Sequence, residues 1–155
     1  MGVPPPDTLL VQARSRLGEV AVRASADADA IDGMSASLVA EPTTAEQVTD
    51  LLAWASAEQL TVTIRGGGTK LEWGGVSTAV DVILSTARLN HAIEHRHGDL
   101  TATVDAGTTL DALNDTLATH RQWLPLDPPW SDRATIGGIL ATNDSGPHRH
   151  RHGAP

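Results

Sequence analysis

Residues 65–70 read Arg65-Gly66-Gly67-Gly68-Thr69-Lys70 and directly follow an apolar alternation, Leu60 to Ile64, that predicts a strand over 60–65. A second glycine-rich segment begins Thr135-Ile136-Gly137-Gly138 and runs on to Gly146. Because glycine has no Cβ, its backbone can approach a ligand closely. Successive N–H groups in such turns form concavities that bind anions without a charged side chain. Two such segments, each with hydroxyl residues beside it, predict a site for two linked phosphates.

Length and composition limit the classes of protein that this chain can be. Its 155 residues suit about one domain, and without Phe or Tyr the core must rest on aliphatic residues, Ala and four Trp. The net charge of −8 argues against nucleic acid or an anionic membrane as a partner, although one dinucleotide needs only a local site. The absence of cysteine excludes a disulfide scaffold, a thiolate nucleophile and a Cys-ligated metal. We see no signal peptide and no apolar run of about 18 residues, so we expect a cytoplasmic protein without membrane insertion.

The first half of the chain shows helical periodicity. Apolar residues spaced by three and four predict a helix over 8–24, with Asp7 as its N-cap, and the Ala- and Asp-rich stretch 25–37 is expected to be a loop. Thr43 and Glu46 match a capping box and predict a second helix that ends near Glu58.

The second half combines strands with short helices. A period of two predicts strands near 79–84, 89–94 and 100–105, the last two joined by a tight turn at 97–99. Gly107 and Thr108 are expected to open a helix that places Leu110, Leu113 and Leu117 on one face. A short helix over 135–141 would hold the glycine pair in its first turn. The fold class predicted by this order is α+β.

The loop at 65–70 differs from two well-known phosphate loops. A P-loop needs Ser or Thr after its Gly-Lys, whereas Lys70 follows Thr69 and precedes Leu71. The third glycine of a Rossmann fingerprint is also replaced by Leu71. A tight turn after a strand would use the same glycines. The second segment favours a ligand site, because Thr135 as a helix cap would place the Gly137 and Gly138 amides at the positive helix end.

Three histidines near the C-terminus are candidate metal ligands. His148, His150 and His152 would share one face of an extended segment, as a metal site requires. The interleaved Arg149 and Arg151 oppose cation binding, so we expect a solvated tail or phosphate-facing basic residues, and no metal site. No spacing of carboxylates singles out an acid–base pair, and catalytic residues stay unknown.

Five segments occur in an order that resembles the flavoproteins of the vanillyl-alcohol oxidase and p-cresol methylhydroxylase (PCMH) type. They are residues 42–48, 65–69, 106–107, 126–128 and 135–143. The resemblance covers about residues 36–155 and is closest to the FAD-binding subunit of bacterial glycolate oxidase. It implies an N-terminal helix and loop over 1–35 and, over 36–155, part of a PCMH-type domain in which two α+β subdomains cradle FAD.

The resemblance implies a flavin-dependent oxidoreductase of the 2-hydroxy-acid (glycolate) type, and a role for each segment. The loop Arg65, Gly66, Gly67, Gly68, Thr69 and Lys70 would wrap the FAD pyrophosphate. Thr135, Gly137 and Gly138 would lie against the pyrophosphate and the isoalloxazine edge. Thr142, Asn143, Ser145 and Gly146 would line the other polar groups of the flavin. Because no His or Cys stands in the 65–70 loop, the FAD is expected to be non-covalent.

Other interpretations stay open at this stage. Members of the family continue for some hundreds of residues, so we expect this chain to be an N-terminal fragment that is inactive without the remainder. Partners would be FAD and other subunits of a glycolate-oxidase-like complex, and not nucleic acid. The alternatives are a non-catalytic interaction subunit or truncated product without stable flavin binding, and an α+β domain for another nucleotide. The substrate and the electron acceptor are not determined by these residues.

Overall fold

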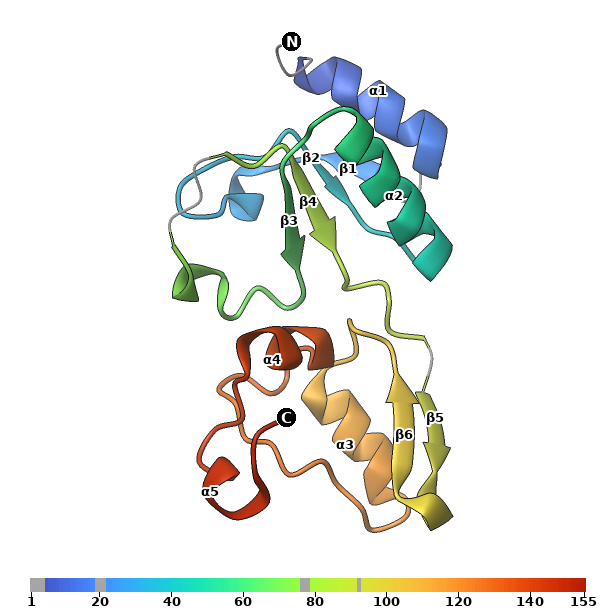
Figure 1. Ribbon diagram of the computed structural model, residues 1–155, viewed down its shortest axis with the longest axis vertical. Helices are drawn as coiled ribbons and strands as arrows, with labels where there is room; N and C mark the ends of the chain where they lie inside the picture. Colours follow the sequence, from blue (N-terminus) through green and yellow to red (C-terminus); the bar gives the residue numbers. More distant parts are fainter. Residues whose placement is uncertain (1–4, 19–21, 76–78, 92) are drawn as a thin grey trace. The chain divides into compact units, whose positions relative to one another are not determined.

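A computed structural model describes residues 5–18, 22–75, 79–91 and 93–155 (Figure 1). It consists of two compact units, which are described separately here. Unit 1 comprises Met1–Arg65 and Leu71–Thr86, and unit 2 comprises Gly66–Lys70 and Ala87–Pro155. The glycine loop therefore belongs to unit 2, although the strand that leads into it belongs to unit 1. Helices and strands occur in both units, and the predicted α+β class is confirmed.

Unit 1 is built on a four-stranded sheet in the order β1 (Val22–Ala24), β2 (Leu38–Ala40), β4 (Val82–Ser85) and β3 (Val62–Arg65). β1 is antiparallel to β2, and β4 is parallel to both β2 and β3. β2 and β4 are buried along their whole length, as expected of strands covered on both faces.

The helices α1 (Pro6–Leu17) and α2 (Ala45–Ala57) cover one face of this sheet (Figure 1). Side chains alternate between the faces of a strand, so Leu38 and Val82 pack with the helices while Val39 and Ile83 point to the other face. The helix-side core comprises Leu9, Ala13, Leu17, Val22, Leu38, Ala40, Leu51, Trp54, Ala55, Leu60, Val82 and Leu84.

The predicted helix over 8–24 is wrong at both ends. α1 begins after Pro5, with Pro6 at a first-turn position that needs no N–H donor, so Asp7 lies inside the first turn instead of capping it. The helix ends at Leu17, and Gly18 follows with φ +80. Residues 22–24 form β1 because they pair with β2, a contact that local periodicity does not reveal. Val20 and Ala21 lie outside the described residues.

The cap of α2 lies one residue later than predicted. Thr44, not Thr43, accepts a hydrogen bond from the Gln47 amide at 3.3 Å. The side chain of Gln47 in turn accepts from the Thr43 amide at 2.8 Å. Gln47 thus takes the place expected for Glu46, but its side chain accepts from the residue before the cap and not from the cap itself, so the predicted capping box is only half formed.

Unit 2 contains the predicted hairpin, β5 (Ile93–Arg96) and β6 (Thr101–Val104), joined by a 3-10 turn at His97–Asp99. β6 lies within the predicted range, but β5 begins four residues later than the strand predicted near 89–94, because pairing with β6 places Ile93 opposite Val104. α3 (Leu110–Ala118) buries the three predicted leucines and is capped by Thr109, one residue after the predicted start. α4 (Ile136–Thr142) is capped by Thr135 as predicted, and α5 (Arg149–His152) follows. In the described parts of both units, no helix has the length and apolarity needed to cross a membrane.

Candidate functional site

The two glycine segments lie against each other within unit 2. A Cβ atom on Gly66 would collide with Oγ1 of Thr135, and one on Gly67 would collide with the carbonyl oxygen of Arg133. These contacts are possible only for glycine, because no side chain fits between the two backbones. The structure thus brings the loop 66–70 together with residues 133–135, which are distant in sequence.

The loop presents N–H groups without partners. Among the residues that the structure describes, the backbone amides of Gly66, Gly67 and Gly68 donate no hydrogen bond. Gly68 has φ +69, a left-handed conformation that glycine adopts without strain. Successive amides around such a residue form an anion-binding concavity. We call Gly66–Thr69 together with Arg133–Thr135 the cradle.

The first turn of α4 offers no free donor to a phosphate. The Ile136 amide donates to the Thr108 carbonyl at 2.8 Å, and the Gly137 amide donates to the Ala106 carbonyl at 2.9 Å. The Gly138 amide donates to Oγ1 of Thr135 at 3.2 Å. The expectation that the Gly137 and Gly138 amides bind a phosphate is therefore not met by this geometry. Their role at the cofactor stays a prediction that depends on close backbone approach.

Thr142, Asn143 and Gly146 have structural roles at the end of α4 and in the segment after it. The Thr142 hydroxyl donates to the Gly138 carbonyl at 2.8 Å within α4. Asn143 ends the helix at φ 52, a left-handed conformation that Asn tolerates. Gly146 has φ +62 and lies so close to Asp127 that a Cβ would collide with its carbonyl oxygen.

Two buried hydroxyls of unit 2 fit a polar ligand better. Ser145 is 1% exposed and Thr108 is 2% exposed, and neither side-chain oxygen has a hydrogen-bond partner. Buried polar atoms are normally satisfied, so an unpaired hydroxyl calls for a partner that the polypeptide does not supply. Ser145 was predicted as a site residue, whereas Thr108 was identified only as the start of a helix.

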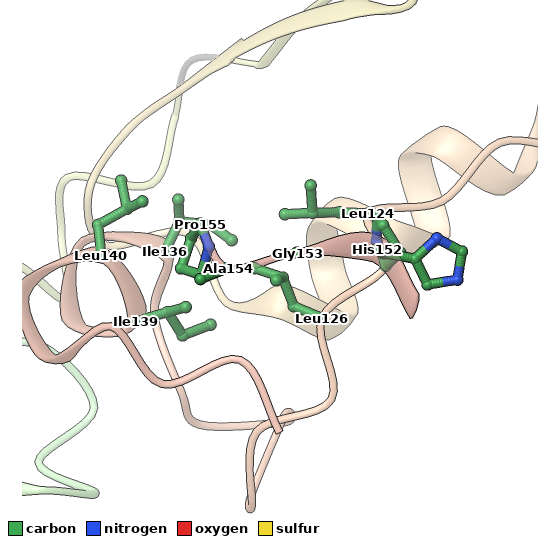
Figure 2. A pocket seen from close by; sticks show the side chains of 10 residues that line it. Leu124, Leu126, Ile136, Ile139, Leu140, His152, Gly153, Ala154 and Pro155 are labelled. Atoms are coloured by element: carbon green, nitrogen blue, oxygen red, sulfur yellow. The ribbon is translucent and has the colours of Figure 1, made fainter. Parts of the chain in front are cut away.

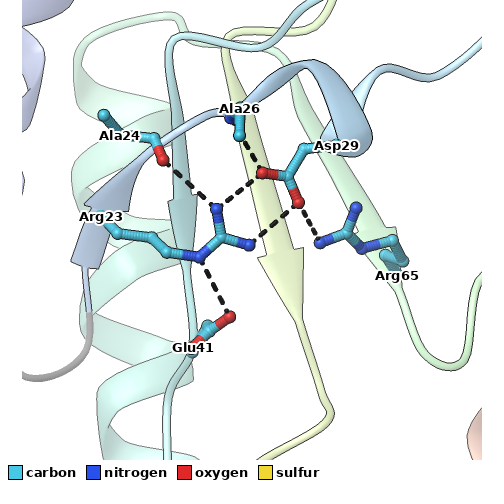
Figure 3. A network of polar contacts seen from close by, with 6 residues as sticks. All are labelled: Arg23, Ala24, Ala26, Asp29, Glu41 and Arg65. Carbon is cyan, nitrogen blue, oxygen red and sulfur yellow. Dashed lines mark hydrogen bonds and ion pairs between the residues drawn. The ribbon is translucent and has the colours of Figure 1, made fainter.

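Arg65, the first residue of the predicted site, is held by an acidic residue of unit 1 (Figure 3). Its Nη2 lies 2.8 Å from Oδ1 of Asp29. Asp29 also binds Arg23 through both carboxylate oxygens, at 2.6 and 2.9 Å, and accepts from the Ala26 amide at 3.0 Å. Asp29 is 5% exposed. Sequence reasoning missed it because Asp29 stands in a short 3-10 helix, Asp27–Asp29, within a stretch that carries no motif and was expected to be a loop.

Asp29 makes the stability of unit 1 depend on pH. Hydrogen bonds from Arg23, the Ala26 amide and Arg65 hold the pKa of the Asp29 carboxyl well below its usual range, against the opposing effect of burial. A carboxyl whose folded pKa is depressed stabilises the fold above its unfolded pKa of about 3.9 and loses that contribution as pH falls. We expect the urea midpoint, followed by fluorescence of the buried Trp54, to fall steeply below about pH 4. Asp29→Asn should flatten this dependence, and an equally steep profile in the variant would contradict the assignment.

Lys70, at the other end of the loop, is also paired. Its Nζ lies 2.9 Å from Oδ2 of Asp144, and the two side chains are 5% and 10% exposed. The same Nζ donates to Oγ1 of Thr69 at 3.2 Å. Both cations that flank the glycines therefore have carboxylate partners, and a bound phosphate would meet mainly neutral N–H groups.

The C-terminal histidines do not form the extended row that was considered. Residues 149–152 are helical, and the rings of His148 and His152 pack edge-on against Trp123, with centroids 5.3 and 5.7 Å away. In the described part of the chain, no group of three His, Asp or Glu side chains is arranged to hold a metal ion.

An apolar pocket of about 290 Å³ lies beside α4. Figure 2 shows the side chains of Leu126, Ile136 and Ile139 directed toward the segment 153–155. Apart from His152 its lining side chains are apolar, so this pocket does not provide a phosphate site.

Comparison with known proteins identifies the family of this chain. Residues 36–155 match the family model described as FAD binding domain. D-lactate dehydrogenase of Archaeoglobus fulgidus is 35% identical over 117 residues, covering 75% of this chain and 26% of that protein. D-2-hydroxyglutarate dehydrogenase of Xanthomonas citri is 33% identical (74% and 24%), and glycolate oxidase subunit GlcD of Escherichia coli is 32% identical (79% and 26%). The chain thus spans about a quarter of the length of these relatives.

Solved structures agree in fold. p-Cresol methylhydroxylase with substrate bound aligns with a TM-score of 0.73 at 21% identity, covering 92% of this chain and 31% of that one. Alkyldihydroxyacetonephosphate synthase aligns with a TM-score of 0.68 at 24% identity, covering 78% and 23%. The likeness to the PCMH-type domain that the sequence suggested is confirmed. The chain belongs to the FAD binding domain family, and its cofactor is FAD.

Proposed function

We propose that this chain forms the pyrophosphate-binding part of a flavin-dependent oxidoreductase that acts on a small 2-hydroxy acid. One observation carries the proposal: the unpaired Gly66, Gly67 and Gly68 amides, which lie in a cradle closed by residues 133–135. Family membership supports FAD as the ligand of this anion site, because FAD contains two linked phosphates. The named relatives that act on D-lactate, D-2-hydroxyglutarate and glycolate support the substrate class.

Each group of residues would have a distinct task. The three glycine amides and the Thr69 hydroxyl would bind the pyrophosphate. The buried hydroxyls of Ser145 and Thr108 would meet other polar atoms of the cofactor. Gly137, Gly138 and Gly146 would keep the backbones close, while Thr135, Thr142 and Asn143 would fix the two ends of α4. FAD, when bound, supplies the redox chemistry, and this chain binds and orients it.

A series of flavins tests the assignment. If the cradle binds linked phosphates, affinity should fall from FAD to FMN and again to riboflavin, since each step removes groups that the amides bind. Titration followed by quenching of flavin fluorescence gives the three dissociation constants. Equal affinities would contradict the proposal. Retention of no flavin by a folded protein would favour the non-catalytic alternative, and a preference for another dinucleotide would favour the third interpretation.

The bound FAD should be non-covalent. The loop that contacts the pyrophosphate contains no His or Cys to form a bond to the flavin. Precipitation of the flavin-loaded protein with acid should release all the yellow colour into the supernatant. Colour that stays with the pellet would contradict this prediction and direct attention to the histidines elsewhere in the chain.

The proposal also covers the substrate, the partner subunits and the cellular location of the protein. Dye-linked oxidation of glycolate, D-lactate and D-2-hydroxyglutarate compares the three named possibilities directly. The chain spans about a quarter of its relatives' length, and we expect these 155 residues alone to bind FAD weakly and to turn over none of these acids. Association with further subunits and a cytoplasmic location belong to the proposal.

A further inference from the structure

We infer that Lys70 and Asp144 are positioning residues: their buried ion pair fixes the glycine loop against the segment after α4, and Lys70 does not itself bind the phosphates. This inference rests on the proposed function. It reverses the expectation for Lys70, which was predicted to contact the cofactor directly, and it assigns a role to Asp144, which no sequence motif singled out.

Burial and distance support an ion pair, although Oδ2 of Asp144 accepts no hydrogen bond from the residues that the structure describes. The two side chains are 5% and 10% exposed, and Nζ of Lys70 lies 2.9 Å from Oδ2 of Asp144. Lys70 directly follows Thr69 of the cradle, and Asp144 directly precedes the buried Ser145. Both segments belong to unit 2. The pair therefore joins two predicted cofactor segments at the points where each carries a hydroxyl.

Energetics favour positioning over a general contribution to stability. Removing two charges from water largely cancels their mutual attraction, so a buried ion pair adds little net stability. Removing one partner is costly, however, because the remaining charge is left buried without compensation. The pair therefore favours the arrangement in which the two segments hold Lys70 and Asp144 together.

Lys70 also contacts the cradle through a hydrogen bond to Thr69. The ammonium donates to Oγ1 of Thr69 at 3.2 Å, so this oxygen acts as an acceptor. The hydroxyl hydrogen then stays available to donate to a phosphate oxygen. Thr69→Val, which removes the hydroxyl at nearly constant volume, should weaken FAD binding, whereas Thr69→Ser should preserve it.

The test is a double-mutant cycle with Lys70→Met, Asp144→Asn and the double variant. Each single variant should weaken FAD binding at least about tenfold, the equivalent of roughly 1.4 kcal/mol, and the two effects should not add. Riboflavin affinity should change much less than FAD affinity, since riboflavin carries no phosphate. The salt dependence of FAD binding should be weak in the parent and unchanged in Lys70→Met. Arg96→Met serves as the control, because it removes an exposed ion pair with Glu94 (67% and 58% exposed) from the same unit.

Several outcomes would overturn the inference. Lys70 would be a direct phosphate ligand if two results came together. Asp144→Asn would bind FAD at least as tightly as the parent, and Lys70→Met would bind FAD more weakly and with a smaller salt dependence. Additive effects would show independent roles, and equal losses for FAD and riboflavin would show a merely structural defect. Lys70→Arg keeps the positive charge and serves as a second variant if Lys70→Met folds poorly. FAD binding retained in Lys70→Arg would support the ion pair, and a loss equal to that of Lys70→Met would contradict it. FAD binding by the parent is measured before the double-mutant cycle. A parent that binds no FAD would refute the proposed function and not this inference alone.

Discussion

Gly67→Val is expected to abolish measurable FAD binding and to destabilise unit 2. The new Cβ would enter the space of the Arg133 carbonyl oxygen, so the loop and residues 133–135 must move apart. Forcing a side chain into a packed contact typically costs about 1–3 kcal/mol. The φ of Gly67 is not positive, so the expected cause is collision within the chain and not backbone strain. FAD titration and urea unfolding measure the two effects.

Gly98→Ala is the matched control for this prediction. Gly98 also belongs to unit 2 and has no positive φ, but a Cβ there would meet no atom within 4 Å. It should leave FAD affinity and the urea midpoint unchanged. If Gly67→Val bound FAD as tightly as the parent, the assignment of the cradle would be wrong.

Gly146→Ala is expected to be the most destabilising single-methyl change in unit 2. At φ +62 an L side chain costs about 1–2 kcal/mol, and the added Cβ would also collide with the Asp127 carbonyl oxygen. Relief of the collision must shift Ser145, whose carbonyl accepts a hydrogen bond from the Asp127 amide at 3.1 Å. We therefore expect a lower urea midpoint together with weaker FAD binding.

Gly153→Ala separates the two causes in Gly146→Ala. Gly153 has φ +90 and ψ −180, which also strains an L side chain, but it is exposed and no atom lies within 4 Å of a Cβ built there. It should lower the urea midpoint far less. Equal losses in the two variants would show that strain alone, and not the contact with Asp127, makes glycine necessary at 146.

Local signals explain which elements could be predicted. The leucines of α3, the Thr135 cap of α4 and the β5–β6 hairpin depend on residues a few positions apart, and all three are present. β1 was missed because its strand conformation comes from pairing with β2, and β2 itself is a three-residue strand after an irregular loop. Short elements carry too few residues for periodicity to identify them.

The two glycine segments could be read from contiguous residues, and the α+β class and the family from the order of short segments along the chain, because none of these depends on contacts between distant residues. Which polar groups are free to bind depends on the folded chain. It satisfied the Gly137 and Gly138 amides with Ala106 and Thr135, and it left those of Gly66, Gly67 and Gly68 unpaired. It also paired Arg65 with Asp29 and Lys70 with Asp144. The physical reason is that a donor or a charge is available only when no part of the folded chain satisfies it, and those partners lie far away in sequence.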